Sequence, residues 1–191
     1  MIEHIKYDWI SGEGSMVLLL PKNVSHLWGG ALPPKEGTIL NTRFRLPEET
    51  ITGSDYDRAV DTYEYVEHSA KPYLVRPLQI GSETGIVIHD DPPTAWIEIE
   101  SGALLLRLTF GEEEDLELLE EIVKTSNNWQ QAFYIVVYSD TFYLIDPAFL
   151  MEKVAESERL EVKLKPGKYI VYDLYEKTDD LEVIAHKMIR V

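Results

Sequence analysis

The apolar residues of this chain gather in short runs that have the length of a β-strand. The longest runs cover residues 17–20 (VLLL), 103–106 (ALLL) and 133–138 (FYIVVY). A membrane helix needs about 20 consecutive apolar residues, so none of these runs is long enough to be one. Apolar runs of this length between Gly, Pro, Ser and Asp are typical of strands joined by turns. They predict a fold that consists mainly of antiparallel strands.

Turn sequences between these runs predict several β-hairpins. The turn SGEG (11–14) would join strands over 5–10 and 15–20, because Gly and Ser favour tight connections between strand-like segments. Two further hairpins are expected to pair 132–138 with 141–145, and 159–164 with 169–175. The other predicted strands cover 73–78, 85–89, 94–100, 103–110 and 181–191.

Three or four short helices are expected between the strands. The clearest covers residues 54–66, where Ser54 is a favourable N-cap and apolar residues recur at the spacing of one buried helix face. The others are predicted over 22–28, 111–124 and 146–156. Residues 29–53 are rich in Gly, Pro and Thr and are interpreted as a long irregular segment. The predicted fold class is therefore α+β, mostly antiparallel strands.

The order of the predicted elements repeats along the chain. Residues 9–28 parallel residues 133–154, and residues 75–99 parallel residues 160–189. Each half reads as a hairpin, a helix, and then a hairpin and a strand. We therefore propose two related halves, 1–125 and 126–191, packed together as one globular unit.

The strongest compositional signal is an excess of acidic residues. The chain of 191 residues has 34 Asp and Glu against 18 Lys and Arg, for a net charge of −16. This charge would repel nucleic acid and anionic membranes and would speed the approach of a basic partner. An acidic surface also keeps many proteins soluble without any specific partner. The charge alone therefore leaves a binding protein and a scaffold or regulatory module both open.

Few features of the sequence point to catalysis. There is no cysteine, which excludes disulfides, thiol chemistry and thiolate metal sites. The N-terminus lacks the pattern of a secretion signal, so a cytoplasmic protein is expected. The stretch HDDPP places His89, Asp90 and Asp91 side by side, and a small metal-dependent hydrolase could use them. Consecutive prolines and Asp-Pro pairs are typical of turns, however, and the spacing matches no ordinary zinc site. We expect a non-enzymatic protein without cofactor or metal.

Residues for binding a partner are easier to propose. Trp28 precedes two flexible glycines, and a tryptophan there is either an exposed anchor or a core residue. The helix over 54–66 carries an acidic stripe of Asp57, Asp61 and Glu64 at helical spacing, and the helix over 111–124 begins with an acidic run. The candidate contact residues are Trp28, Asp55, Asp57, Asp61, Glu64, Glu112, Glu113 and Glu114.

Several distinctive motifs lie in the first two thirds of the chain. They are DWISGEGS and VLLLP (8–21), Trp28-Gly29, DYDRAVD (55–61), GIVIHDDPPTAW (85–96) and LLLRLTF (104–110). Together these motifs resemble the immunity protein 21 family of bacterial polymorphic-toxin systems. The match spans most of residues 7–124. The chain departs from the family pattern at Ser15-Met16, Val60 and His89, and none of these changes removes a group with an assigned role.

The resemblance implies a cytoplasmic antidote that binds the catalytic domain of a cognate toxin and blocks it. Many delivered toxins are nucleases with basic clefts, and an acidic inhibitor could occupy such a cleft. The resemblance thus implies a protein partner of opposite charge, and neither nucleic acid nor membrane.

Overall fold

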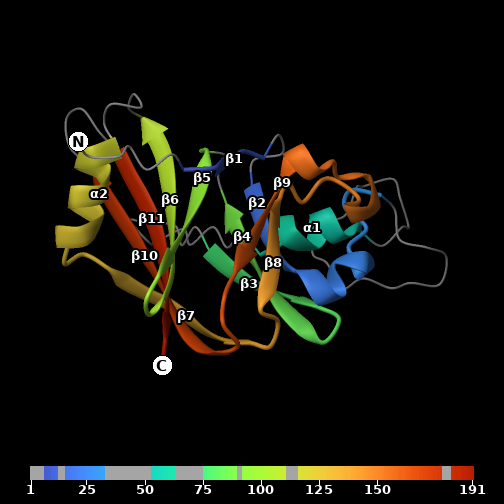
Figure 1. Cartoon of the computed structure of the whole chain (residues 1–191). Helices are drawn as coiled ribbons and strands as arrows, with labels where there is room; N and C mark the ends of the chain where they lie inside the picture. The colour runs from blue at the N-terminus through green and yellow to red at the C-terminus, as the bar shows by residue number, and fades with distance from the viewer. Residues whose placement is uncertain are drawn as a thin grey trace.

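Two antiparallel sheets packed face to face form the protein, with helices on the outer face of each sheet (Figure 1). The computed structural model describes residues 7–12, 16–32, 53–62, 75–89, 92–110, 116–177 and 182–191. Sheet A has the strand order β1-β5-β6-β11-β10-β7, and sheet B has the order β3-β4-β2-β8-β9. The expected α+β class with mostly antiparallel strands is confirmed.

The strands of each sheet come from both ends of the chain. Sheet A contains β1 (Trp9–Ile10), β5 (Thr94–Ile99), β6 (Gly102–Phe110), β7 (Gln130–Val137), β10 (Gly167–Lys177) and β11 (Glu182–Arg190). Sheet B contains β2 (Met16–Pro21), β3 (Val75–Ile80), β4 (Glu83–His89), β8 (Thr141–Ile145) and β9 (Arg159–Lys163). Residues 1–125 and 126–191 thus contribute strands to both sheets and share one interior.

The helices are short. They are the α-helices α1 (Asp55–Val60) and α2 (Leu116–Thr125) and the 3-10 helices η1 (Lys22–Leu27), η3 (Met151–Lys153) and η4 (Glu156–Glu158). The α-helix expected over 146–156 is wrong, because this segment contains only the 3-10 turn η3, and η4 begins at its last residue. Met151 and Val154 both pack on sheet B, and a spacing of three residues suits a 3-10 turn. Among the described residues, no helix combines the length and the apolar character required to cross a membrane.

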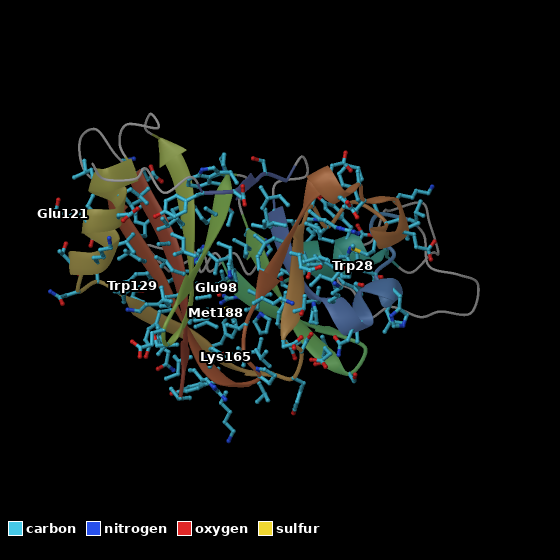
Figure 2. The ribbon with its side chains drawn as sticks, in the orientation of Figure 1. Trp28, Glu98, Glu121, Trp129, Lys165 and Met188 are labelled. Carbon is cyan, nitrogen blue, oxygen red and sulfur yellow. The ribbon has the colours of Figure 1, made fainter. Side chains whose placement is uncertain are left out.

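Three apolar clusters hold these layers together. The inner core lies between the sheets and includes Leu19, Ile88, Leu144 and Met188, and Figure 2 shows Met188 in this position. Side chains of η1, α1 and η3 cover the outer face of sheet B. Helix α2 covers part of the outer face of sheet A. The order of layers is therefore α2, sheet A, sheet B, and then η1, α1 and η3 (Figure 1).

The three hairpins expected from the turn sequences are wrong. In each case the chain crosses from one sheet to the other, from β1 to β2, from β7 to β8 and from β9 to β10. The reason lies in the central strands of sheet B. Every residue of β2 and β8 is buried, because the inner core lies on one side and the helices on the other. Such strands appear as continuous apolar runs rather than alternating ones.

The strand order has an internal symmetry. Strands β1, β2, β4, β5 and β6 can be matched in order with β7, β8, β9, β10 and β11. With this matching, and with β3 left out, the strand order of each sheet is the same from either end. Two related halves would produce this order, and the relationship itself stays a prediction. The structure does correct which segments correspond. The sequence pattern matches β3, β4 and β5 with β9, β10 and β11, whereas in the strand order it is β4, β5 and β6 that correspond to these three strands.

Candidate functional site

The acidic stripe predicted on the first helix lies on α1, and its residues make contacts within the protein. Asp57 accepts hydrogen bonds from the backbone N–H of Ser54 (2.6 Å) and from its hydroxyl (2.8 Å). The Ser54 Oγ accepts in turn from the Asp57 N–H, which completes a capping box. Asp57 therefore stabilises the start of the helix.

Asp55 holds the chain that follows Trp28 against the same helix. Its carboxylate accepts from the Gly29 N–H (2.8 Å) and from Arg58 Nη1 (2.7 Å), and its side chain is only 13% exposed. Asp61 is half-buried at the end of α1 and donates its backbone N–H to Asp57 O (2.9 Å). Glu64 lies outside the described residues. The described part of the stripe is thus engaged in local structure.

Trp28 is a core residue and not an exposed anchor. Its side chain is 1% exposed, and its Nε1 donates to Pro147 O at 3.0 Å. It packs on the outer face of sheet B with Leu20 and Ile145, and Figure 2 shows it on that side of the molecule. Of the two roles considered for this residue, the structure shows the structural one.

The acidic run before α2, with Glu112, Glu113 and Glu114, lies outside the described residues. Within α2, Glu121 points away from sheet A (Figure 2). Glu120 accepts hydrogen bonds from Lys124 (2.7 Å) and from the hydroxyl of Tyr7. These two donors lower the pKa of Glu120. The helix therefore presents acids to solvent on one face and closes the outer core of sheet A with the other.

The histidine of HDDPP also has a structural environment. His89 is buried at the end of β4, and its Nε2 lies 2.8 Å from Thr62 Oγ1. Its carbonyl accepts a hydrogen bond from Arg107 Nη1 (2.5 Å). Burial, with Arg76 and Arg107 nearby, lowers the pKa of His89 to about 4. The imidazole is neutral at neutral pH and faces a threonine hydroxyl.

Asp90 and Asp91 lie outside the described residues. Within the part of the chain that the structure describes, no three His, Asp or Glu side chains are grouped so that they could hold a metal ion.

A row of apolar residues lies on the outer face of sheet A. Five residues align across five strands in the order Ile99, Gly102, Ile189, Ile170 and Tyr134. We call them the outer row. Tyr134 is 66% exposed, and Val136 on β7 and Tyr138 directly after it extend the apolar surface along this edge of the sheet. Ile135 and Val137 alternate with these residues and belong to the inner core.

Helix α2 leaves this surface open. Its buried residues Leu119 and Val123 pack over Leu106 and Leu174, and none of the outer row belongs to that cluster. Residues 130–138 contain no charged side chain, although charged residues make up 27% of the chain. Lys168 lies beside Val136 at the margin of this surface. Exposed apolar residues on neighbouring strands are candidates for a protein interaction site.

Sequence reasoning missed the outer row although one signal was present. Residues 133–138 alternate so that Tyr134, Val136 and Tyr138 share one face. The segment was interpreted as half of a hairpin, and its position at a sheet edge depends on pairing between distant strands. Comparisons with protein-family models, curated proteins and solved structures find no match for the chain.

Proposed function

We propose that this chain is a non-catalytic immunity protein that binds a basic toxin domain and neutralises it. The observation that carries the proposal is the outer row, which ends at the exposed Tyr134 on the edge strand β7, with the exposed Tyr138 directly after that strand. The motifs that resemble the immunity protein 21 family and the net charge of −16 support the choice of partner.

The outer row has the size and chemistry of the centre of a protein interface. Five neighbouring strands span roughly 19 Å at the usual spacing between strands, which fits within a standard interface. Tyrosine is enriched among the residues that dominate binding energy, because its ring buries a large area and its hydroxyl still forms a hydrogen bond. The row lies on regular strands, so little backbone ordering is required on binding.

The acidic charge would act before contact. A net charge of −16 attracts a basic domain over distances that exceed direct contact and raises the association rate. The apolar row would then supply the lasting contacts, since burial of aromatic side chains slows dissociation. In this proposal the net charge of the whole molecule speeds association, and the outer row slows dissociation of the bound partner.

The test is binding between the purified chain and the toxin domain encoded by the neighbouring gene. Tyr134→Ala and Tyr138→Ala should each raise the dissociation constant by about tenfold or more, because truncation of a central tyrosine costs about 2 kcal/mol. Leu27→Ala is the matched control, since Leu27 is an exposed apolar residue on η1. Absence of a complex at low salt would refute toxin binding. A complex that is unaffected by both tyrosine changes would refute the outer row as the contact surface.

A metal-dependent hydrolase that uses the His89-Asp90-Asp91 turn makes a different prediction. It requires a bound divalent metal and loss of hydrolysis in His89→Ala. Elemental analysis of the purified protein separates the two functions, because a stoichiometric metal would favour the hydrolase and contradict the proposal.

A further inference from the structure

Three buried polar atoms that have no hydrogen-bond partner among the described residues lie in one row on the inner face of sheet A. They are Trp96 Nε1, His186 Nε2 and Asp173 Oδ2. Strand register aligns Trp96 with Leu105, Leu105 with His186, and His186 with Asp173. We call these four residues the inner row. Unpartnered buried atoms are uncommon in folded proteins, so their grouping in a single row needs a physical cause.

The side chains of His186 and Asp173 point between the two sheets. Their neighbours Ala185 and Leu174 belong to the cluster under α2, on the opposite face, and side chains alternate along a strand. His186 is 1% exposed. Trp96 and Leu105 pack with the inner core. The inner row therefore lies inside the sandwich.

The hydrogen bond between His186 and Asp173 fixes which imidazole nitrogen carries the proton. His186 Nδ1 lies 3.0 Å from Asp173 Oδ1, and a carboxylate only accepts hydrogen bonds. Nδ1 therefore donates. Burial lowers the pKa of His186, nearby Arg107 acts in the same direction, and Asp173 opposes them. The neutral imidazole that results leaves Nε2 as an acceptor.

The donor and acceptor pattern of the inner row selects its ligand. Trp96 Nε1 is a donor, whereas His186 Nε2 and Asp173 Oδ2 are acceptors. Nδ1 and Nε2 lie on opposite sides of the imidazole ring, so a molecule bound at Nε2 does not also reach the carboxylate that accepts from Nδ1, and at least two small molecules are needed. One must donate to Asp173 Oδ2, and the other must donate to His186 Nε2 and can accept from Trp96 Nε1. Water fits both places, an ammonium ion cannot accept from the indole, and a simple anion cannot donate to the two acceptors.

The spacing within the row suits a very small ligand. The backbones of Trp96 and His186 are two strands apart, roughly 10 Å, and both side chains extend into the space between the sheets. A small molecule between these two side chains can contact both. Each buried polar atom left without a partner costs about 1–3 kcal/mol, so the molecules that satisfy these atoms would be held firmly.

We propose that the inner row is an internal water site, in which one bound water donates to His186 Nε2 and accepts from Trp96 Nε1 and a second water donates to Asp173 Oδ2. Bound water of this kind forms about three hydrogen bonds to otherwise unsatisfied buried groups and is part of the native structure. The site does not depend on the proposed partner, and a free chain should contain it.

Magnetic relaxation dispersion of solvent water tests the proposal, because it detects water molecules that stay inside a protein longer than the protein takes to tumble. The full chain should show at least one such water. Trp96→Phe, which removes only the indole N–H, should shorten its residence time. His186→Leu combined with Asp173→Leu should abolish its contribution, since apolar residues of similar size often replace a buried polar pair without loss of folding.

Ser139→Ala is the matched control. Ser139 is also buried and polar, but it donates to Thr141 O at 2.8 Å, so the change should leave the dispersion amplitude as in the wild type. An amplitude in the wild type that equals that of the double leucine variant would overturn the proposal. If the double variant does not fold, nitrogen NMR of His186 decides. The site is supported if only Nδ1 of His186 is protonated and the residence time of the bound water is shorter in Trp96→Phe. It is overturned if Nε2 is protonated at neutral pH, or if the residence time of the water is unchanged in Trp96→Phe.

Discussion

Trp28 connects η1 to the segment that follows β8. Its indole fills the outer core of sheet B and donates to Pro147 O, so Trp28→Phe loses buried area and leaves a carbonyl without its donor. We expect a loss of about 2 kcal/mol in the free energy of unfolding. Urea denaturation followed by far-UV circular dichroism measures it. The neighbouring change Leu27→Ala, at a half-exposed residue, should stay within about 0.5 kcal/mol.

His89 makes stability depend on pH. Its folded pKa of about 4 lies below its ordinary value of 6.5, so the folded state binds a proton less readily than the unfolded chain. The contribution is complete above about pH 6.5 and declines as the pH falls toward 4. Between about pH 7 and pH 5, the wild type should lose about 2 kcal/mol more than His89→Gln. Equal losses in the two proteins would show that His89 does not titrate in this way.

At the scale of single elements, the capping box of α1 gives a separate prediction. Asp57→Ala removes the acceptor for the Ser54 N–H and hydroxyl, and we expect a loss of about 1 kcal/mol in stability. Asp57→Asn keeps a side-chain oxygen and should recover part of the loss. Glu152 is an exposed acid on η3, so Glu152→Ala controls for the loss of a negative charge alone. Thermal unfolding compares the wild type with Asp57→Ala, Asp57→Asn and Glu152→Ala. An equal effect of Asp57→Ala and Glu152→Ala would mean that the capping box contributes nothing.

The elements themselves could be predicted better than their pairing. Residues 141–145 were predicted as the strand that β8 forms, and α1 begins directly after its predicted cap Ser54. Both depend on local features, the apolar run and the N-cap. Which strand lies next to which depends on contacts between distant residues, and a short turn such as Ser139-Asp140 can close a hairpin or carry the chain to a second sheet. The continuous apolar runs of β2 and β8, which are buried throughout in the structure, are the sequence feature that indicates a crossing to a second sheet.

At the scale of the whole molecule, the residues of the candidate site could also be predicted better than their positions in the fold. The sequence identified acidic residues, but it did not show that Asp55 and Asp57 are used to hold α1 and Gly29. It also contained the alternating residues of β7 without showing that they lie at a sheet edge. Exposure is a property of the assembled sheets, because α2 covers one part of sheet A and leaves the outer row open.

The acidic charge predicts a strong dependence of binding on salt. With a net charge of −16, the association rate constant with the basic partner should fall about tenfold between roughly 50 mM and 500 mM salt, because salt screens charges at a distance. The dissociation rate constant should change much less, since apolar contacts of the outer row would govern it. Surface plasmon resonance over a salt series measures both. An association rate that is independent of salt would remove the assigned role of the charge.

Hydrogen exchange of the chain with and without the toxin domain examines the proposed contact surface most directly. We expect slower exchange on binding at the amides of β7 and the adjoining half of β10, residues 130–138 and 167–172, with no change in η1 and α1. Protection confined to η1 and α1, with β7 exchanging as in the free chain, would contradict the proposal that this protein acts through the outer row of sheet A.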